Sequence, residues 1–170
     1  MFEKGEFLIY GNHGICRLED IVHMNVAGVD KNQLYYMLVP LHLKESKIYI
    51  PVDSTKVSMR RALNSQEAAQ LVDGVVDIDA VSVEDEKQRE YVYKKIMEKG
   101  RPQDWICMIK TLYIRRKERN SQGKKITAID EKYLRMAEEN LYSELSFALG
   151  IKKENMEEYI TNRVNALKDK

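Results

Sequence analysis

Three histidines and two cysteines are the side chains of this sequence whose chemistry could bind a metal ion or attack a substrate. His13, His23 and His42 have no acidic or cysteine partners at a metal-site spacing, so turn and surface roles are expected. Cys16 and Cys107 lie in segments of different type, which favours two buried thiols in a reducing cytoplasm over a disulfide. No glycine-rich phosphate loop, Cys-x-x-Cys pair or Gly-x-Ser-x-Gly elbow occurs. The sequence therefore predicts no catalytic residue, no metal and no cofactor.

A basic segment carries the clearest binding chemistry. Residues 87–125 hold 13 Lys and Arg against 4 Asp and Glu, a local balance of +9. On a helix, Lys87, Tyr91 and Lys94 share one face, with Lys95 beside them. Lysines neutralise phosphates, while a tyrosine ring packs against a sugar or a base. This combination favours a nucleic acid as the partner of the segment.

A second basic cluster ends the following helix. Arg115, Arg116 and Lys117 stand there, and Arg89 precedes them on the first helix. The helix dipole also favours cations at a helix C-terminus, so this cluster alone leaves both interpretations open. The charge of the whole segment exceeds what dipole complementation requires, which favours nucleic acid. Because residues 126–170 hold 7 Lys and Arg against 9 Asp and Glu, we expect weak, salt-dependent binding.

The elements that carry these residues change in type and charge near the middle of the chain. Residues 1–83 hold 8 Lys and Arg against 11 Asp and Glu, a balance of −3, and residues 84–170 hold 20 against 16, a balance of +4. The first sixty residues have the pattern of short strands and turns, whereas residues after about 84 have the helical period. We predict an α+β fold with a Tudor-like small antiparallel β-barrel followed by a compact all-helical domain. The expected division is 1–60 (β domain), 61–83 (short helix and linker) and 84–170 (helical domain).

Local signals set the expected element ends. Strands are expected over residues 6–10, 15–24, 33–40 and 46–52, with a positive-φ turn over residues 11–14 and a bend in the second strand. A capping pattern over residues 64–67 opens a short helix, and longer helices are expected from Ser82 to Gly100 and from Pro102. Residues 127–130 begin another helix, and residues 153–167 form the last. Trp105, at helical spacing from Ile109 and Leu112, is expected in the core rather than on DNA.

The strands offer a candidate surface for protein binding. Tyr35, Met37, Ile48 and Tyr49 are apolar enough to leave one face or edge available, and strand addition at an exposed edge is a common way to bind protein. The alternative is that all of them pack inside the barrel. The apolar stretches are too short to span a bilayer, and the N-terminus lacks the apolar core of a signal peptide. A cytoplasmic monomer that does not bind membranes is expected.

The order of several motifs resembles the CarD/CdnL family of bacterial transcription regulators, whose β module also begins the polymerase-binding segment of transcription-repair coupling factors. Residues 7–14 are similar to its opening φ-x-Y-x-x-H-G motif. Residues 35–38 and 48–52 fall where the family has its Y-x-x-L and φ-x-φ-P strands. Residues 108–113 and 137–145 are similar to its helical domain. The likeness covers roughly residues 1–150.

The resemblance implies a β domain that docks on the β subunit of bacterial RNA polymerase and a helical domain that touches promoter DNA near the melted region. It implies no enzyme, but a protein that changes the stability of the open complex at initiation. The polymerase-binding residues are then expected among Met24, Tyr35, Met37, Ile48, Tyr49 and Pro51, and the DNA-binding residues among Lys87, Arg89, Tyr91, Lys94, Lys95, Arg115, Arg116 and Lys117.

Two departures from the family pattern shape this hypothesis. Family members place a wedge tryptophan near the start of the first long helix, where this chain has no aromatic residue before Tyr91. Some members use arginines on the β domain where this chain has Met24 and Tyr49. We therefore expect a more apolar polymerase contact and an electrostatic DNA contact without a wedge. The alternative is an adaptor whose helical half binds a protein and never DNA; a hydrolase is disfavoured because no nucleophile–base pair is present.

Overall fold

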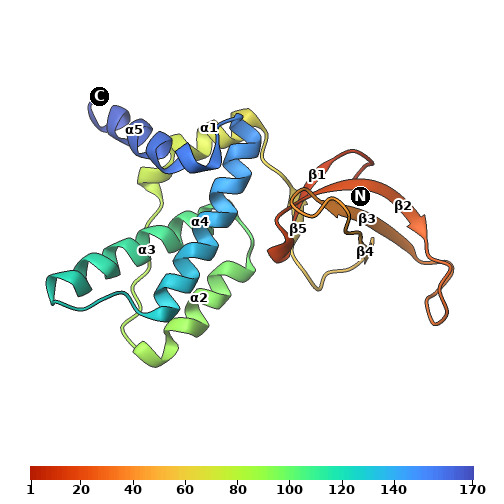
Figure 1. Cartoon of the computed structure of the whole chain (residues 1–170), viewed down its shortest axis with the longest axis horizontal. Helices are drawn as coiled ribbons and strands as arrows, with labels where there is room; N and C mark the ends of the chain where they lie inside the picture. Colours follow the sequence, from red (N-terminus) through yellow and green to blue (C-terminus); the bar gives the residue numbers. More distant parts are fainter. The chain divides into compact units, whose positions relative to one another are not determined.

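The computed structural model describes residues 1–170 and divides into two compact units, Met1–Ala62 and Leu63–Lys170 (Figure 1). The first unit contains every β-strand and the second contains every α-helix. The α+β class predicted from the sequence is therefore confirmed. The short helix and linker expected over residues 61–83 lie in the second unit from Leu63 onward.

Five antiparallel strands form the sheet of the N-terminal unit. They are β1 (Phe7–Tyr10), β2 (Ile15–His23), β3 (Leu34–Pro40), β4 (Ile48–Pro51) and β5 (Met59–Arg61), in the order β4-β3-β2-β1-β5. The four predicted strands form, and the short β5 was not predicted. Gly11 follows β1 at φ +45°, and a Cβ there would stand 2.6 Å from the Val57 side chain, so only glycine fits. The predicted bend in β2 coincides with a register shift between Leu18 and Asp20.

The barrel expected from the strand pattern is not closed. The strand order begins at β4 and ends at β5, so the sheet has two edges. Closure requires these edge strands to pair, and each is short: four residues in β4 and three in β5. The unit is an open five-stranded sheet.

One face of this sheet carries the hydrophobic core of the unit. Alternate residues of the strands are buried there: Leu8, Cys16, Leu18, Tyr36, Leu38 and Ile50. Burial raises the pKa of the Cys16 thiol to about 11, so this cysteine stays protonated as a packing residue.

Five α-helices and three 3₁₀ turns make up the C-terminal unit. The helices are α1 (Ser65–Asp73), α2 (Arg89–Glu98), α3 (Pro102–Ser121), α4 (Ala128–Leu149) and α5 (Met156–Lys168). The predicted capping pattern before α1 is a complete capping box between Asn64 and Glu67. The helix expected from Ser82 begins only at Arg89, because the Asp85 carboxylate accepts from the Lys87 N–H and a 3₁₀ turn, Glu86–Gln88, comes first.

The packing of α3 against α4 forms the core of this unit (Figure 1). Trp105, Ile109 and Leu112 are buried on α3, and the tryptophan is only 2% exposed. This confirms the predicted core stripe. The linker between α1 and α2 packs on α3. Thr111 Oγ1 of α3 accepts from the Val81 N–H at 3.0 Å, and the Lys110 ammonium of α3 donates to the carbonyls of Val75 and Ile78. None of the five helices combines the length and the apolar composition needed to cross a membrane.

A buried ionic network joins α2, α3 and α4. Arg115 on α3 donates from Nε to the Asp130 carboxylate at 2.5 Å, and its two terminal nitrogens donate to the Glu86 carboxylate at 2.9 Å each. Tyr93 on α2 donates its hydroxyl proton to the other oxygen of Asp130 at 3.0 Å. Arg89 donates to the Glu86 carboxylate, to the Tyr93 hydroxyl and to a linker carbonyl. The Arg115 guanidinium on α3 thus holds both the turn before α2, through Glu86, and the start of α4, through Asp130.

We expect Arg115→Met to lower the free energy of unfolding of the helical unit by about 3–5 kcal/mol, because it leaves the buried Asp130 carboxylate without its cation. Urea unfolding followed by fluorescence measures this, since Trp105 is the sole tryptophan and lies in α3. The matched control is Arg116→Met, which removes an exposed cation over the Tyr113 ring and should cost under about 1 kcal/mol. Equal costs for the two variants would contradict the assigned role of Arg115.

A pH dependence follows from Glu86. The Arg115 guanidinium lowers the pKa of the Glu86 carboxyl in the folded chain, and Arg89 adds to this effect. A carboxyl with a lowered folded pKa stabilises the fold above its unfolded pKa, about 4.3, and this contribution is lost as the pH falls through the folded value. Because the Glu86 side chain is 64% exposed, we expect Glu86→Gln to cost at most about 1 kcal/mol at pH 7.

The same unfolding measurement at several pH values tests this expectation. The difference between the wild type and Glu86→Gln should shrink as the pH falls below about 4, while the control Glu84→Gln, an exposed neighbour, should show little difference at any pH. A wild-type advantage that persists unchanged at pH 3 would exclude the proposed linkage.

Candidate protein and nucleic-acid interfaces

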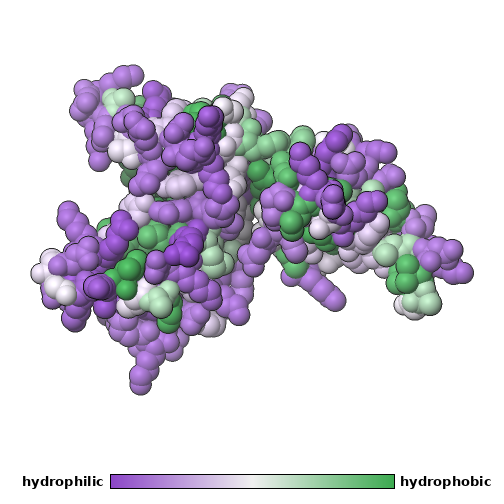
Figure 2. Space-filling view, viewed as in Figure 1, coloured by the Kyte–Doolittle hydropathy of each residue, from purple (hydrophilic) through white to green (hydrophobic).

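The register between β3 and β4 places an apolar strip on the face of the sheet opposite the core. Tyr35 pairs with Pro51, and Met37 pairs with Tyr49. The residues that alternate with them, Tyr36, Leu38 and Ile50, are buried in the core. Tyr49 is 40% exposed, and the other three are half-buried. Figure 2 shows hydrophobic residues among hydrophilic ones on the visible surface of this unit. Four of the six predicted protein-binding residues therefore lie together.

The two remaining predicted residues lie elsewhere. Ile48 pairs with Leu38, so its side chain shares the core face, where it packs against the buried cluster. Met24 directly follows the end of β2 and is half-buried. Val22, which was not predicted, pairs with Tyr35 and extends the strip onto β2. We define the outer strip as Val22, Tyr35, Met37, Tyr49 and Pro51.

The backbone of the edge strand β4 offers little to a partner strand. The Val52 N–H donates to the Leu34 carbonyl, so alternation directs the Ile50 groups toward β3 and the Tyr49 N–H and C=O away from it. Pro51 has no N–H, and its carbonyl accepts from Ser54. Within β4, Tyr49 alone presents both a donor and an acceptor at the open edge. Strand addition there is limited to one residue, so the side chains of the outer strip are the larger binding feature.

On α2, the predicted lysines and tyrosine are exposed. Lys87 lies in the 3₁₀ turn before the helix, and Tyr91, Lys94 and Lys95 project from its first two turns. Tyr91 is 60% exposed, and the Lys95 ammonium lies 5.5 Å from the centre of its ring. Lys95 also approaches Glu98 at 3.4 Å, an exposed pair of little energetic weight. We define this set of four residues as the α2 basic face.

Two of the predicted DNA-binding arginines are used inside the fold. Arg89 and Arg115 belong to the buried network, where every guanidinium nitrogen of Arg115 donates to a carboxylate. Arg115 is only 9% exposed. A phosphate could reach it only by displacing Glu86 or Asp130, so we do not include these two arginines in a DNA-facing surface.

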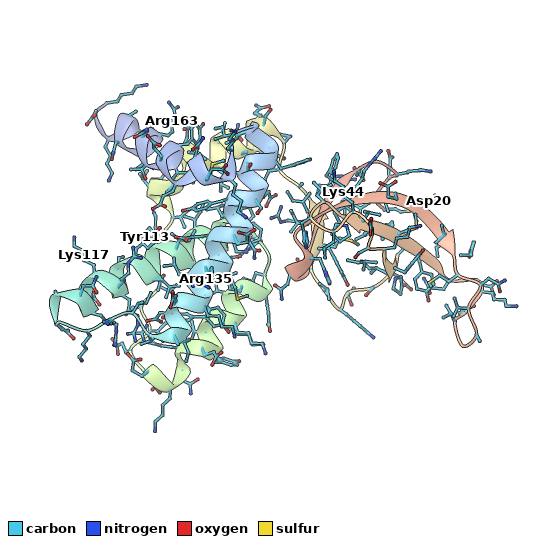
Figure 3. The ribbon with its side chains drawn as sticks, viewed as in Figure 1. Asp20, Lys44, Tyr113, Lys117, Arg135 and Arg163 are labelled. Carbon is cyan, nitrogen blue, oxygen red and sulfur yellow. The ribbon has the colours of Figure 1, made fainter.

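The end of α3 presents a separate exposed pair. Arg116 lies over the ring of Tyr113, with its guanidinium carbon 4.8 Å from the ring centre, and Lys117 is exposed near the C-terminal end of the helix (Figure 3). Beyond them, Arg119 donates to the Lys125 carbonyl and so closes the loop after the helix. The predicted cluster therefore divides into one buried arginine and two exposed cations.

The residues first considered for chemistry are dispersed. His13 stacks on Tyr10 at 5.4 Å between ring centres, His23 ends β2, and His42 lies in the turn after β3. The structure contains no group of three or more His, Cys, Asp or Glu side chains arranged to hold a metal ion. The candidate features that the geometry brings together are the outer strip and the α2 basic face.

Comparison with known families agrees with this description of the N-terminal unit. Residues 2–63 match the model of the CarD-like/TRCF RID domain, and the match ends within one residue of the boundary between the two units. No curated protein matches the chain. The matched family is a family of protein-interaction domains, and it indicates an RNA polymerase-interacting module. The N-terminal unit, which carries the outer strip, is therefore similar to CarD-like/TRCF RID domains over almost its whole length.

Proposed function

We propose that the chain is a bacterial, cytoplasmic regulator of transcription initiation. Its N-terminal unit binds the β subunit of RNA polymerase, and its helical unit contacts promoter DNA and changes the stability of the open complex. The single observation that carries this proposal is the family match over residues 2–63, on the unit whose outer strip is apolar and partly exposed. The protein acts as a monomer that bridges two unlike partners.

The outer strip supplies the polymerase contact in this proposal. Aromatic residues and methionine are enriched in the centres of protein interfaces, where charged residues are depleted. The strip contains two tyrosines and one methionine. Its two β3–β4 pairs, Tyr35 with Pro51 and Met37 with Tyr49, are not hydrogen-bonded to each other, so their side chains approach closely. Tyr49 is the most exposed of the paired residues, and its backbone N–H points to the open edge of β4. It is therefore the expected anchor of the interface.

The α2 basic face supplies the DNA contact. Its three lysines are exposed, and Tyr91 offers a ring to a sugar or base. Trp105 is buried in the core and cannot act as a wedge, so this contact depends on phosphate neutralisation. The helical unit would hold the upstream edge of the melted region electrostatically. Its effect on open-complex lifetime should weaken as the salt concentration rises.

The alternative function is an adaptor that binds polymerase and a second protein without touching DNA. The hydrogen bonds of Arg89 and Arg115 within the helical unit favour this alternative, because they remove two cations from the basic segment. Promoter footprinting distinguishes the two functions: the adaptor binds polymerase without a salt-sensitive change in the footprint.

For the polymerase contact, we expect Tyr49→Ala to weaken binding to purified bacterial RNA polymerase by about tenfold or more, or at least about 1.4 kcal/mol, the effect of truncating an interface anchor. Pull-down and surface binding measurements with the whole chain test this. Lys56→Ala, an exposed change in the loop after β4, is the control and should bind normally. If Tyr49→Ala folds and binds like the wild type, the outer strip is not the contact.

For the DNA contact, we expect the double variant Lys94→Glu/Lys95→Glu to reduce the protein's effect on the lifetime of the open complex. The slope of log affinity against log salt concentration should fall in magnitude by about 2, one for each lost phosphate contact. The control is Lys152→Glu/Lys168→Glu, which makes the same change of net charge at exposed positions outside the basic segment. An unchanged lifetime with the first variant, or equal losses with both, would exclude the α2 basic face.

A further inference from the structure

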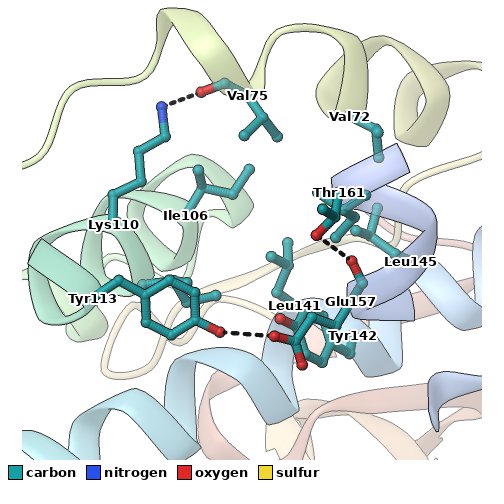
Figure 4. A pocket seen from close by; sticks show the side chains of 12 residues that line it. Val72, Val75, Ile106, Lys110, Tyr113, Leu141, Tyr142, Leu145, Glu157 and Thr161 are labelled. Atoms are coloured by element: carbon teal, nitrogen blue, oxygen red, sulfur yellow. Dashed lines mark hydrogen bonds between the residues drawn. The ribbon is translucent and has the colours of Figure 1, made fainter. Parts of the chain in front are cut away.

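A cavity of about 180 Å³ lies between α1, α3, α4 and α5 of the helical unit (Figure 4). Most of its lining is apolar, with Val72 from α1, Ile106 from α3, Leu141 and Leu145 from α4, and Ile160 from α5. A cavity of about 150 Å³ with a similar lining is large enough to take benzene. The space therefore fits a single aromatic or short aliphatic group.

Two carboxylates stand beside this cavity around one phenol. The Tyr113 hydroxyl lies 2.7 Å from Glu138 Oε1 and 3.4 Å from Glu157 Oε1. A phenol has one proton, so it donates to one carboxylate at a time and leaves the other without that hydrogen bond. Burial, with the Glu138 hydrogen bond, raises the pKa of Tyr113 far above its usual value, and burial raises that of Tyr142 to about 12. Both phenols remain neutral, and the carboxylates are the charges at this end.

The nearby cations are held by other groups. Lys110 also lines the cavity, but its ammonium donates to the backbone carbonyl of Val75, as Figure 4 shows, and to that of Ile78. Arg116 lies over the outer part of the site, on the ring of Tyr113. The apolar cavity thus has the Glu157 carboxylate and two tyrosine rings in its lining, with Glu138 hydrogen-bonded to Tyr113 beside it. The charge that complements these carboxylates is positive.

We propose that this cavity binds a small organic cation, with its apolar or aromatic body among the aliphatic side chains and its ammonium group against Glu157 and Glu138. The ammonium gives Glu157 the hydrogen bond that Tyr113, which donates to Glu138, cannot supply. A face of the Tyr142 ring also attracts a cation, whereas Arg116 already covers one face of Tyr113. This site lies outside both proposed interfaces and adds a small-molecule ligand to a chain otherwise expected to bind macromolecules.

The C-terminal helix has a defined role in this site. Glu157, Ile160 and Thr161 all project from α5, and Thr161 donates to the Glu157 carbonyl at 2.8 Å. Arg163, one turn further, forms two hydrogen bonds with the Asp73 carboxylate on α1, at 2.6 and 3.1 Å. The wall that carries Glu157 is therefore fixed to the opposite side of the cavity rather than loosely attached.

Three probes with the same phenylethyl body test the charge preference on the whole chain: 2-phenylethylammonium, neutral 2-phenylethanol and anionic 3-phenylpropanoate. By calorimetry we expect the cation to bind with a Kd on the order of 0.1–1 mM, ordinary for a ligand of about nine non-hydrogen atoms, and the anion to bind at least about tenfold more weakly. Amide chemical-shift changes should map to α3, α4 and α5 around the cavity.

Matched variants locate the site. Glu157→Gln should weaken binding of the cation at least about fivefold, with little effect on the neutral probe. Glu158→Gln, at the next residue of α5, which is also exposed, should bind as the wild type. Ile160→Phe should fill the cavity and block all three probes. If Glu157→Gln does not fold, Glu138→Gln makes the same test. Absence of binding at 10 mM probe, equal binding of cation and anion, or equal losses in the two α5 variants would overturn the proposal.

Discussion

The ion pair between Arg115 and Asp130 is the interaction on which the helical unit depends. Asp130 is almost fully buried at the start of α4, and a carboxylate in that position is tolerated only with a cation and hydrogen bonds to satisfy it. Arg115 supplies both, and its remaining nitrogens hold Glu86 at the entry of α2. The position of α2 against α3 and α4 therefore depends on a guanidinium that donates to both carboxylates at once. A lysine, with one nitrogen, could not make these parallel bonds.

The same network determines which charges are left for a partner. It uses two arginines of the basic segment and leaves the lysines of α2 at the surface. Lysines are compact, strongly hydrated charges suited to phosphates without sequence preference. A nucleic-acid contact made by such a face is positional and salt-dependent, and it reads no bases. This lack of sequence preference fits the proposed regulator, which would be positioned on a promoter by its polymerase contact rather than by the DNA sequence.

Much of the local structure could be predicted because it follows from short-range rules. The capping box at Asn64, the positive-φ turn after β1 and the buried stripe through Trp105 each depend on neighbouring residues. The role of Arg115 was missed, although continuing the stripe from Leu112 by three residues leads directly to it. Its partners Glu86 and Asp130 are 29 and 15 residues away, and the sequence alone does not pair them.

The predicted protein-binding set shows the same division between local and distant information. Strand alternation separates Ile48 from Tyr49, so both could not face one partner, and the sequence already contained this fact. The cross-strand pairing of Met37 with Tyr49, the inclusion of Val22 and the open barrel depend on register, which no single strand specifies.

The β4 edge, one of the two edges of the sheet, offers little backbone to a partner. An exposed edge strand is an aggregation hazard, and β4 reduces it by being short and by ending in Pro51. This protection also limits strand addition to the backbone groups of Tyr49. In the proposed polymerase contact, recognition on the β4 side would then come from side chains of the outer strip, where shape and aromatic contacts give specificity. At the β4 edge, a single residue with free backbone groups beside an apolar strip leaves little backbone for indiscriminate strand pairing, and this is compatible with the proposed side-chain contact.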